Sequence, residues 1–252
     1  MQGKKQQTAD QKRLGKKVGC GICGCAFTIP AFIIFMIYIT TFSNYCAKMF
    51  GEETYPIAGD PSRFDPFVGI AEIRSKLGAK AILLDVRASG VRSDGTLDLN
   101  AKYKPSPNAD YDFRAPSKEE PEEMPPIGAG RKPGDIWVQN VSVRVYEPGL
   151  RRSVTKTSGN SRTSYTYTNE GMDVDRGTPQ MGSLDEGIPD PKMSIKQMWD
   201  FALSKGADKE AVAQITYDDD GYDFMITGLK FYIYWDKDGK LMESRSQWPG
   251  KD

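Results

Sequence analysis

The sequence predicts an α+β fold: an N-terminal transmembrane helix followed by a tandem of helix-plus-antiparallel-sheet (αβββ) units. Three observations predict it. A long uncharged apolar run lies near the N-terminus, which is typical of a membrane-spanning helix. Two amphipathic helical patterns lie in the rest of the chain, and each is followed by segments in which apolar and polar residues alternate. Such alternation indicates half-buried strands, so we expect each helix to cover one face of a small antiparallel sheet.

Charge is balanced overall but unevenly distributed. The chain of 252 residues carries 34 Lys and Arg and 34 Asp and Glu. Residues 1–17 contain six of the basic residues and one acidic residue, Asp10, so this tail has a net charge of +5 and the remainder −5. A mildly acidic body argues against a nucleic-acid partner, because phosphate groups must be neutralised by cations. The sequence contains no histidine, which removes the usual general base near neutral pH.

The apolar run is expected to be a permanent membrane anchor. No charged residue lies between Lys17 and Lys48, a stretch of 30 residues, and its most apolar part is residues 21–42. Because the basic tail precedes this segment, the positive-inside rule puts the N-terminus in the cytoplasm and the body outside. The expected location is the cell (inner) membrane, with lipid as the partner of residues 21–42. Gly21 and Gly24 are candidates for close helix packing within the membrane.

Two other interpretations of this segment fit less well. A cleaved signal peptide has a shorter apolar region followed by a small-x-small site, and no such site follows the run. A pilin-like assembly helix would carry a glutamate early in its apolar stretch, and none is present. The cysteines are not expected to bind a metal, because Cys46 lies at the opposite end of the span from Cys20, Cys23 and Cys25. Lipidation of Cys20 or Cys23 stays open.

The first unit begins with a well-marked helix. Asp65 is a suitable N-cap, and the apolar spacing predicts a helix over 66–77 that ends at Gly78, with Arg74 as the one polar residue on its apolar face. Residues 114–135 and 169–192 lack apolar periodicity and are predicted to be a Pro-rich loop and a linker. Strands are predicted at 81–88, 95–103, 109–113, 135–147 and 164–168, with an Asp94-Gly95 turn and a bulge near Gln139-Asn140.

The second unit repeats this plan. Ser194 and Gln197 form a capping box before a helix that ends at Gly206. Alternation predicts strands at 213–217, 222–226 and 229–235, with a turn at 236–239 towards Leu241. The stretch AVAQITYDDDGYDFMITGLKFYIYWDKDGKL, with its strand, acidic turn and strand, resembles PepSY-like domains. That resemblance implies a non-enzymatic, extracytoplasmic and regulatory or inhibitory domain, and it assigns no functional residue.

The predicted organisation of the chain follows from these elements. Its parts are a basic cytoplasmic tail (1–17), a transmembrane anchor (18–47), a connector (48–63), a first helix-plus-sheet unit (64–168), a linker (169–192) and a second helix-plus-sheet unit (193–248). Either unit alone would be small, so we expect the two to pack together or to share one sheet.

Candidate contact residues lie on two predicted strands and their neighbourhood. If Phe231 and Trp235 face the helix, Tyr232 and Tyr234 lie on the other face of the strand. Two exposed tyrosines there favour packing against another sheet or contact with a protein partner. Two Asp-rich turns, 218–221 and 236–239, lack the glutamate that a calcium loop needs six residues after its glycine. No metal site, cofactor or catalytic residue is therefore predicted. The candidate partner contacts are Tyr232, Tyr234, Arg151, Arg152, Tyr165 and Tyr167.

These features favour a non-catalytic function. We expect a single-pass membrane-anchored extracytoplasmic binding or scaffold protein that is an accessory subunit of a membrane or envelope complex. Two alternatives stay open. One is a carboxylate-dependent hydrolase of the cell envelope, which would need two carboxyl groups about 5–10 Å apart in a concave site. The other is a pilin-like subunit of a surface assembly.

Overall fold

The structure is a computed structural model, and it describes residues 34–35, 37–38, 53–117, 132–158, 161–226, 228 and 231–246. The chain divides into two compact units. The larger, called the main unit, comprises residues 52–151 and 169–252. In the smaller, which comprises residues 1–51 and 152–168, the structure describes a two-stranded hairpin of β5 (Arg151–Ser158) and β6 (Ser161–Thr168).

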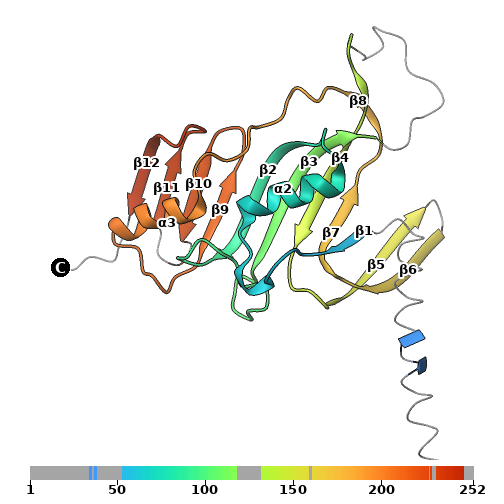
Figure 1. Ribbon diagram of the computed structural model, residues 1–252, viewed down its shortest axis with the longest axis horizontal. Helices are drawn as coiled ribbons and strands as arrows, with labels where there is room; N and C mark the ends of the chain where they lie inside the picture. Colours follow the sequence, from blue (N-terminus) through green and yellow to red (C-terminus); the bar gives the residue numbers. More distant parts are fainter. Residues whose placement is uncertain are drawn as a thin grey trace, which may run out of the picture. The chain divides into compact units, whose positions relative to one another are not determined.

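One antiparallel sheet of ten strands dominates the main unit (Figure 1). Its order is β1-β7-β4-β3-β2-β9-β10-β11-β12, and the short strand β8 pairs with the first residues of β4. Its strands are β1 (Glu53–Pro56), β2 (Ile82–Val91), β3 (Asn108–Pro116), β4 (Ile136–Val145), β7 (Gly171–Arg176), β8 (Gln180–Gly182), β9 (Ala213–Tyr217), β10 (Tyr222–Ile226), β11 (Phe231–Trp235) and β12 (Leu241–Ser246).

Two helices, α2 (Pro66–Leu77) and α3 (Ile195–Ser204), lie on the same side of this sheet (Figure 1). α2 begins as predicted, because the Asp65 side chain accepts hydrogen bonds from two backbone amides of its first turn. A short 3₁₀ turn, η1 (Pro61–Arg63), precedes it. α3 has the predicted capping box of Ser194 and Gln197. Both helices therefore start where the local sequence specifies. Because they lie on the same side, neither covers the opposite face of the sheet.

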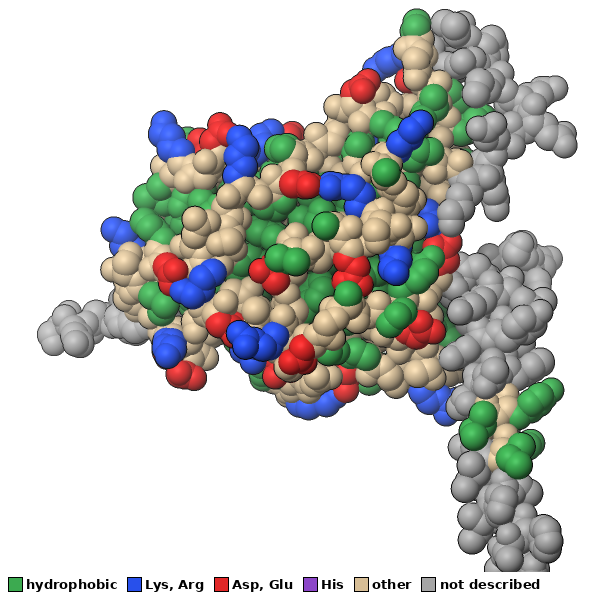
Figure 2. Space-filling view, viewed as in Figure 1, with side chains coloured by type: hydrophobic (Ala, Val, Ile, Leu, Met, Phe, Trp, Pro, Cys, Tyr) green, Lys and Arg blue, Asp and Glu red, His purple; other side chains and the backbone are tan. Residues whose placement is uncertain are grey.

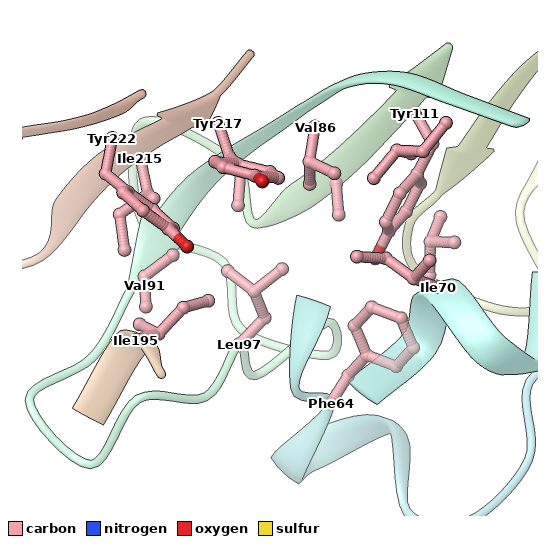
Figure 3. Close-up of a cluster of buried hydrophobic side chains, with 14 of the residues drawn as sticks. Phe64, Ile70, Val86, Val91, Leu97, Tyr111, Ile195, Ile215, Tyr217 and Tyr222 are labelled. Atoms are coloured by element: carbon pink, nitrogen blue, oxygen red, sulfur yellow. The ribbon is translucent and has the colours of Figure 1, made fainter. Parts of the chain in front are cut away.

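The core lies between the helices and the sheet and is continuous across both halves of the main unit. Figure 3 shows Ile195 of α3 and Ile215 of β9 in the same cluster as Leu97, which comes from the loop after β2. Phe67 of α2 packs on Tyr217 of β9 with ring centroids 6.0 Å apart. Because a side chain of the first helix contacts a strand of the second half, the two halves share one core.

The two halves join at β2 and β9, which are the first strands after α2 and α3. These strands pair antiparallel, with Val86 opposite Tyr217 and Ala88 opposite Ile215. From this seam, β3 and β4 follow outward in the first half, and β10 and β11 follow outward in the second. The halves are therefore related in plan by an approximate two-fold rotation about an axis through the seam.

The predicted fold class is wrong. The described chain is mainly antiparallel β-sheet with the helices α2 and α3, and its first half contributes β1, β7, β4, β3 and β2 in a row, with β8 beside β4, rather than the three strands of an αβββ unit. Of the two arrangements expected for the units, the structure shows the shared sheet, through the pairing of β2 with β9. Among the described residues, no helix is both long enough and apolar enough to cross a membrane. The predictions of a single-pass transmembrane anchor and of an inner-membrane location are corrected with it. Of the segment 21–42, only residues 34–35 and 37–38 are described, and these four are helical.

Two segments of the main unit fold differently from their predicted forms. Residues 95–103 form a loop, in which Leu97 makes an isolated bridge to Phe64 and is fully buried. No edge of β2 was left for this segment, because β3 and β9 occupy both. The predicted linker 169–192 contains β7 and β8. Only two of the six residues of β7 are apolar, which explains why alternation did not indicate a strand there.

The irregular alternation within the predicted strand 135–147 has a different cause from the predicted bulge. β4 runs in unbroken register along β3 through Gln139 and Asn140. On its other side, residues 136–138 pair with β8 and residues 141–145 pair with β7. The change in alternation therefore marks a change of neighbouring strand.

Candidate binding face

The face of the sheet that turns away from α2 and α3 carries an ordered array of polar side chains, and we call it the open face. Its residues are those that alternate with the buried core residues along each strand. The register brings one residue from each of nine strands into a single row across this face: Thr54, Asp173, Arg144, Asp110, Arg87, Thr216, Asp223, Tyr234 and Glu243.

Ion pairs hold the middle of this row in place. The Arg144 guanidinium donates from Nε to Oδ1 of Asp110 at 2.5 Å, and this hydrogen bond raises the pKa of Arg144. Nη2 of Arg87 lies 2.5 Å from a carboxylate oxygen of Asp85 and 3.7 Å from one of Asp112. Arg144 therefore pairs within the row, whereas Arg87 pairs with two carboxylates beside the row, one on its own strand and one on the adjacent strand.

A second row beside the first is acidic. Asp85 and Asp112 stand opposite each other on β2 and β3, and Ser142 of β4 donates from Oγ to Oδ1 of Asp112 at 2.6 Å. Burial raises the pKa of Asp85; the hydrogen bond from Arg87 opposes this shift, and the negative charges of Asp112 and Asp218 add to it. The two carboxylates share one guanidinium, and neither lines either of the cavities described below.

Acidic residues outnumber basic ones on the open face. Figure 2 shows the helix-bearing side of the molecule, where acidic and basic side chains are interspersed. Among the side chains that the structure describes, seven acidic residues and three arginines lie on the open face by register: Asp85, Asp110, Asp112, Asp173, Asp175, Asp223 and Glu243 against Arg87, Arg114 and Arg144. In the part of the chain that the structure describes, Asp175 and Asp223 take part in no ion pair.

The end of the open face at β10 and β11 is aromatic. Tyr232 donates its hydroxyl to Oδ1 of Asp223 at 2.5 Å, and Tyr234 donates to the backbone oxygen of Asp220 at 2.7 Å. Burial, together with the bond to Asp223, raises the pKa of the Tyr232 hydroxyl. Met225 lies opposite Tyr232 on the neighbouring strand and is 37 % exposed. Both tyrosines alternate with buried core residues, and their hydroxyls fix the positions of their rings.

The other predicted contact residues lie on the hairpin or outside the described residues. On β5 and β6, Arg151 and Arg152 are exposed, Tyr165 is half-buried and Tyr167 is only 4 % exposed. The hydroxyls of Thr155 and Ser164 lie 2.9 Å apart and link the two strands. The role of these residues as partner contacts stays a prediction. Gly21 and Gly24 lie outside the described residues.

Two hollows of the main unit lie apart from the open face. One has a volume of about 550 Å³ and is lined by residues of the loop after β2 and of the segment before β9, among them Arg92 and Lys209. The other, of about 520 Å³, lies beside the start of β2 and is lined by residues such as Arg74 and Ile188. Within the described ranges, no three or more Cys, Asp or Glu residues are grouped so that they could hold a metal ion.

Comparison with known proteins gives no match: no family model, no curated protein and no solved structure is similar to this chain. The resemblance of the second half to PepSY-like domains therefore stays a prediction.

The charged rows were missed at the sequence level because they depend on pairing. Alternation in NADYDFRAP already puts Asn108, Asp110, Asp112 and Arg114 on one side of a strand. What alternation does not give is the neighbour of each strand, and the alignment of Asp110 with Arg144 requires residues 34 positions apart to be in register. Only the tyrosines of β11 could be recognised from one strand alone.

Proposed function

We propose that this protein is a non-catalytic binding subunit, an accessory component of a larger complex, whose open face takes up a cationic segment of a partner protein. The observation that carries the proposal is the group formed by Tyr232, Tyr234 and Asp223 on a face that neither α2 nor α3 covers. This group is called the aromatic–acidic site.

The aromatic–acidic site suits a lysine or arginine side chain. A cation over a tyrosine ring gains about 0.5–2 kcal/mol, more as water is excluded. The carboxylate of Asp223, which forms no ion pair within the described chain, would compensate the same charge. Met225 adds exposed apolar surface beside the tyrosines, and Tyr and Met are enriched in protein interfaces.

Charge complementarity extends the argument from this site to the whole open face. Among its described side chains, seven acidic residues against three arginines leave an excess of negative charge, and one of the seven, Asp175, has no ion pair among the described residues. Complementary charge speeds encounter and sets orientation. A polar outer face is ordinary for an antiparallel sheet, but two positioned tyrosines and an acidic excess also fit a basic partner.

The test is titration of the full chain with a synthetic ten-residue peptide of alternating Arg and Ser. Isothermal titration calorimetry measures the affinity, and amide chemical-shift mapping locates the binding surface. We expect shifts confined to β9–β11 and the neighbouring strands of the open face. A peptide of the same length with Glu in place of Arg should not bind. Replacing both tyrosines (Tyr232→Ala and Tyr234→Ala) should weaken binding at least about tenfold, or about 1.4 kcal/mol.

A matched pair of charge variants separates a specific site from general attraction. Asp175→Asn with Asp223→Asn removes two charges from the open face, whereas Asp200→Asn with Asp208→Asn removes two from α3 and the loop that follows it. The first pair should weaken binding several-fold more than the second. Equal losses, or peptide-induced shifts on α2 and α3 instead of the strands, would contradict the proposal.

A further inference from the structure

The hollow of about 550 Å³ lies at one end of the seam between the two halves of the sheet, and we call it the seam pocket. Val91 and Ala213 form the last registered pair of β2 with β9 at this end. The pocket is lined by residues 92–94, which follow Val91, and by residues 209–212, which precede Ala213. Tyr103 and Lys104 complete the lining. Its volume falls within the range of about 300–1,000 Å³ that is usual for small-molecule sites.

Cations exceed anions in the lining of the seam pocket. Its three cations are Arg92, Lys104 and Lys209. Arg92 is already paired, because its guanidinium lies 3.6 Å from a carboxylate oxygen of Asp94 and 3.7 Å from one of Asp98. Oδ1 of Asp94 accepts hydrogen bonds from the amide and the hydroxyl of Thr96 at 3.0 and 2.7 Å. Neither lysine forms an ion pair within the described ranges of the chain. The positive charge left over in the pocket therefore comes from the two lysines, against the single carboxylate of Glu210.

The remaining lining is rigid and partly apolar. Nη2 of Arg92 donates to the backbone oxygen of Ser62 at 2.7 Å and to Oγ1 of Thr96 at 2.9 Å, which holds the guanidinium in place. The Tyr103 hydroxyl donates to the backbone oxygen of Gly90 at 2.8 Å and fixes its ring. Ala211 and Val212 add aliphatic surface. Preorganised polar groups beside an apolar wall are the usual composition of a small-molecule site.

We infer that the seam pocket binds a compact organic anion. Lys104 and Lys209 hold its phosphate or carboxylate group, and a small ring or aliphatic portion lies against Tyr103 and Val212. The pocket shares no residue with the open face, so this inference is independent of the proposed function. Because the lining comes from both halves of the sheet, a bound anion would also bridge them.

The test is calorimetric titration of the full chain with four probes: inorganic phosphate, phenyl phosphate, benzoate and phenol. We expect phenyl phosphate to bind more tightly than inorganic phosphate, because only the former supplies the ring. Phenol, which lacks the charge, should not bind. Comparison of benzoate with phenyl phosphate distinguishes a carboxylate ligand from a phosphate ligand. Affinity for the anionic probes should fall when NaCl rises from about 0.05 to 0.5 M, since the lysines are exposed to solvent.

Two double variants locate the binding. Lys104→Ala with Lys209→Ala should lower the affinity for phenyl phosphate at least about tenfold, because two charged hydrogen-bond donors are lost. Lys102→Ala with Lys205→Ala removes the same charge from nearby positions outside the lining and should change affinity less than about twofold. The inference is overturned if no anionic probe binds at millimolar concentration, if phenol binds as well as phenyl phosphate, or if both double variants lose affinity equally.

Discussion

At the residue scale, one glycine is required where the turn between β9 and β10 lies against the backbone at the end of β11. Gly221, in the turn between β9 and β10, has φ +142°, and a Cβ atom added there would lie 2.2 Å from the backbone oxygen of Trp235. Backbone of the neighbouring strand cannot move aside as a flexible side chain can. The Asp-Gly pair at this turn is thus explained by sterics, in agreement with the turn that the sequence predicts.

We expect Gly221→Ala to lower the free energy of unfolding by about 2–4 kcal/mol, because alanine disfavours this φ and its Cβ would collide with the backbone oxygen of Trp235. Gly59→Ala is the matched control, because Gly59 has a similarly positive φ of +84° but no atom within 4 Å of the added Cβ. It should cost only about 1 kcal/mol. Urea denaturation of both variants checks the difference, and equal losses would show that the close approach does not matter.

At the element scale, a single ion pair ties α2 to the segment that leads into α3. Arg74 was the polar exception on the apolar face of the predicted helix. It donates through Nη1 and Nη2 to both carboxylate oxygens of Asp190 at 2.9 and 2.6 Å, and through Nε to the backbone oxygen of Ala81. The arginine therefore satisfies three acceptors from the rim of the core, and this explains its place on the buried side of α2.

The Arg74–Asp190 pair should make stability pH-dependent. The hydrogen bond from Arg74 lowers the pKa of Asp190. The stability that this pair contributes is therefore fully present above the pKa of an unfolded Asp, about 3.9, and is lost as pH falls through the pKa of Asp190 in the folded protein. The Asp190 side chain is 59 % exposed, so Asp190→Asn should cost less than about 1 kcal/mol at pH 7. Thermal unfolding of wild type and variant should converge as pH falls below the folded pKa of Asp190.

Asp200→Asn is the comparison for this measurement, because Asp200 pairs with Lys196 one turn away on the exposed side of α3. It should change stability by no more than a few tenths of a kcal/mol. A gap between wild type and Asp190→Asn that stays constant from pH 7 to pH 2.5 would contradict a role for the carboxylate charge.

Also at the element scale, both outer strands of the sheet carry features that discourage further strand pairing. β1 is four residues long and ends in Pro56, which lacks an amide donor. The pairing of β11 with β12 shifts register between Tyr234 and Trp235, which places a bulge beside Met242. Short edge strands, proline and bulges all limit the addition of another chain. Contacts with a partner are thus better sought on the open face than at the sheet edges.

At the scale of the whole molecule, the shared sheet predicts that both halves of the main unit unfold together. Ile215 of β9 is 2 % exposed and stands opposite Ala88 of β2. Ile215→Ala should cost about 2–5 kcal/mol as a core truncation. We expect hydrogen exchange of β3 amides, in the first half, to lose as much protection as that of β10 amides, in the second half.

Val154→Ala, in the hairpin outside the main unit, is the control and should leave both sets of amides unchanged within about 0.5 kcal/mol. Retention of wild-type protection in β3 of Ile215→Ala, with loss in β10, would show that the halves are independent after all.

The whole-molecule architecture was also the level at which sequence reasoning was least successful. Caps, turns and alternation are local, so the starts of α2 and α3 and the strands around residues 109–113, 213–217 and 222–226 are confirmed. The chain does turn at Asp94-Gly95, but the hairpin expected there does not form, because residues 95–103 are a loop. Alternation identified Leu97 as buried but could not show that a loop buries it. The pairing of β2 with β9 depends on contacts between distant segments, and no local pattern encodes it.

The seam also has a consequence for how the chain is made. On the ribosome, β2 is complete long before β9 has been synthesised, because most of the first half and the connecting segment separate them in the sequence. Until then one side of β2 has no partner strand, and its apolar residues stand beside unsatisfied amides and carbonyls. The nascent polypeptide therefore passes through a stage at which premature association with other chains must be prevented, and chaperones that shield exposed strands would be most useful during that interval.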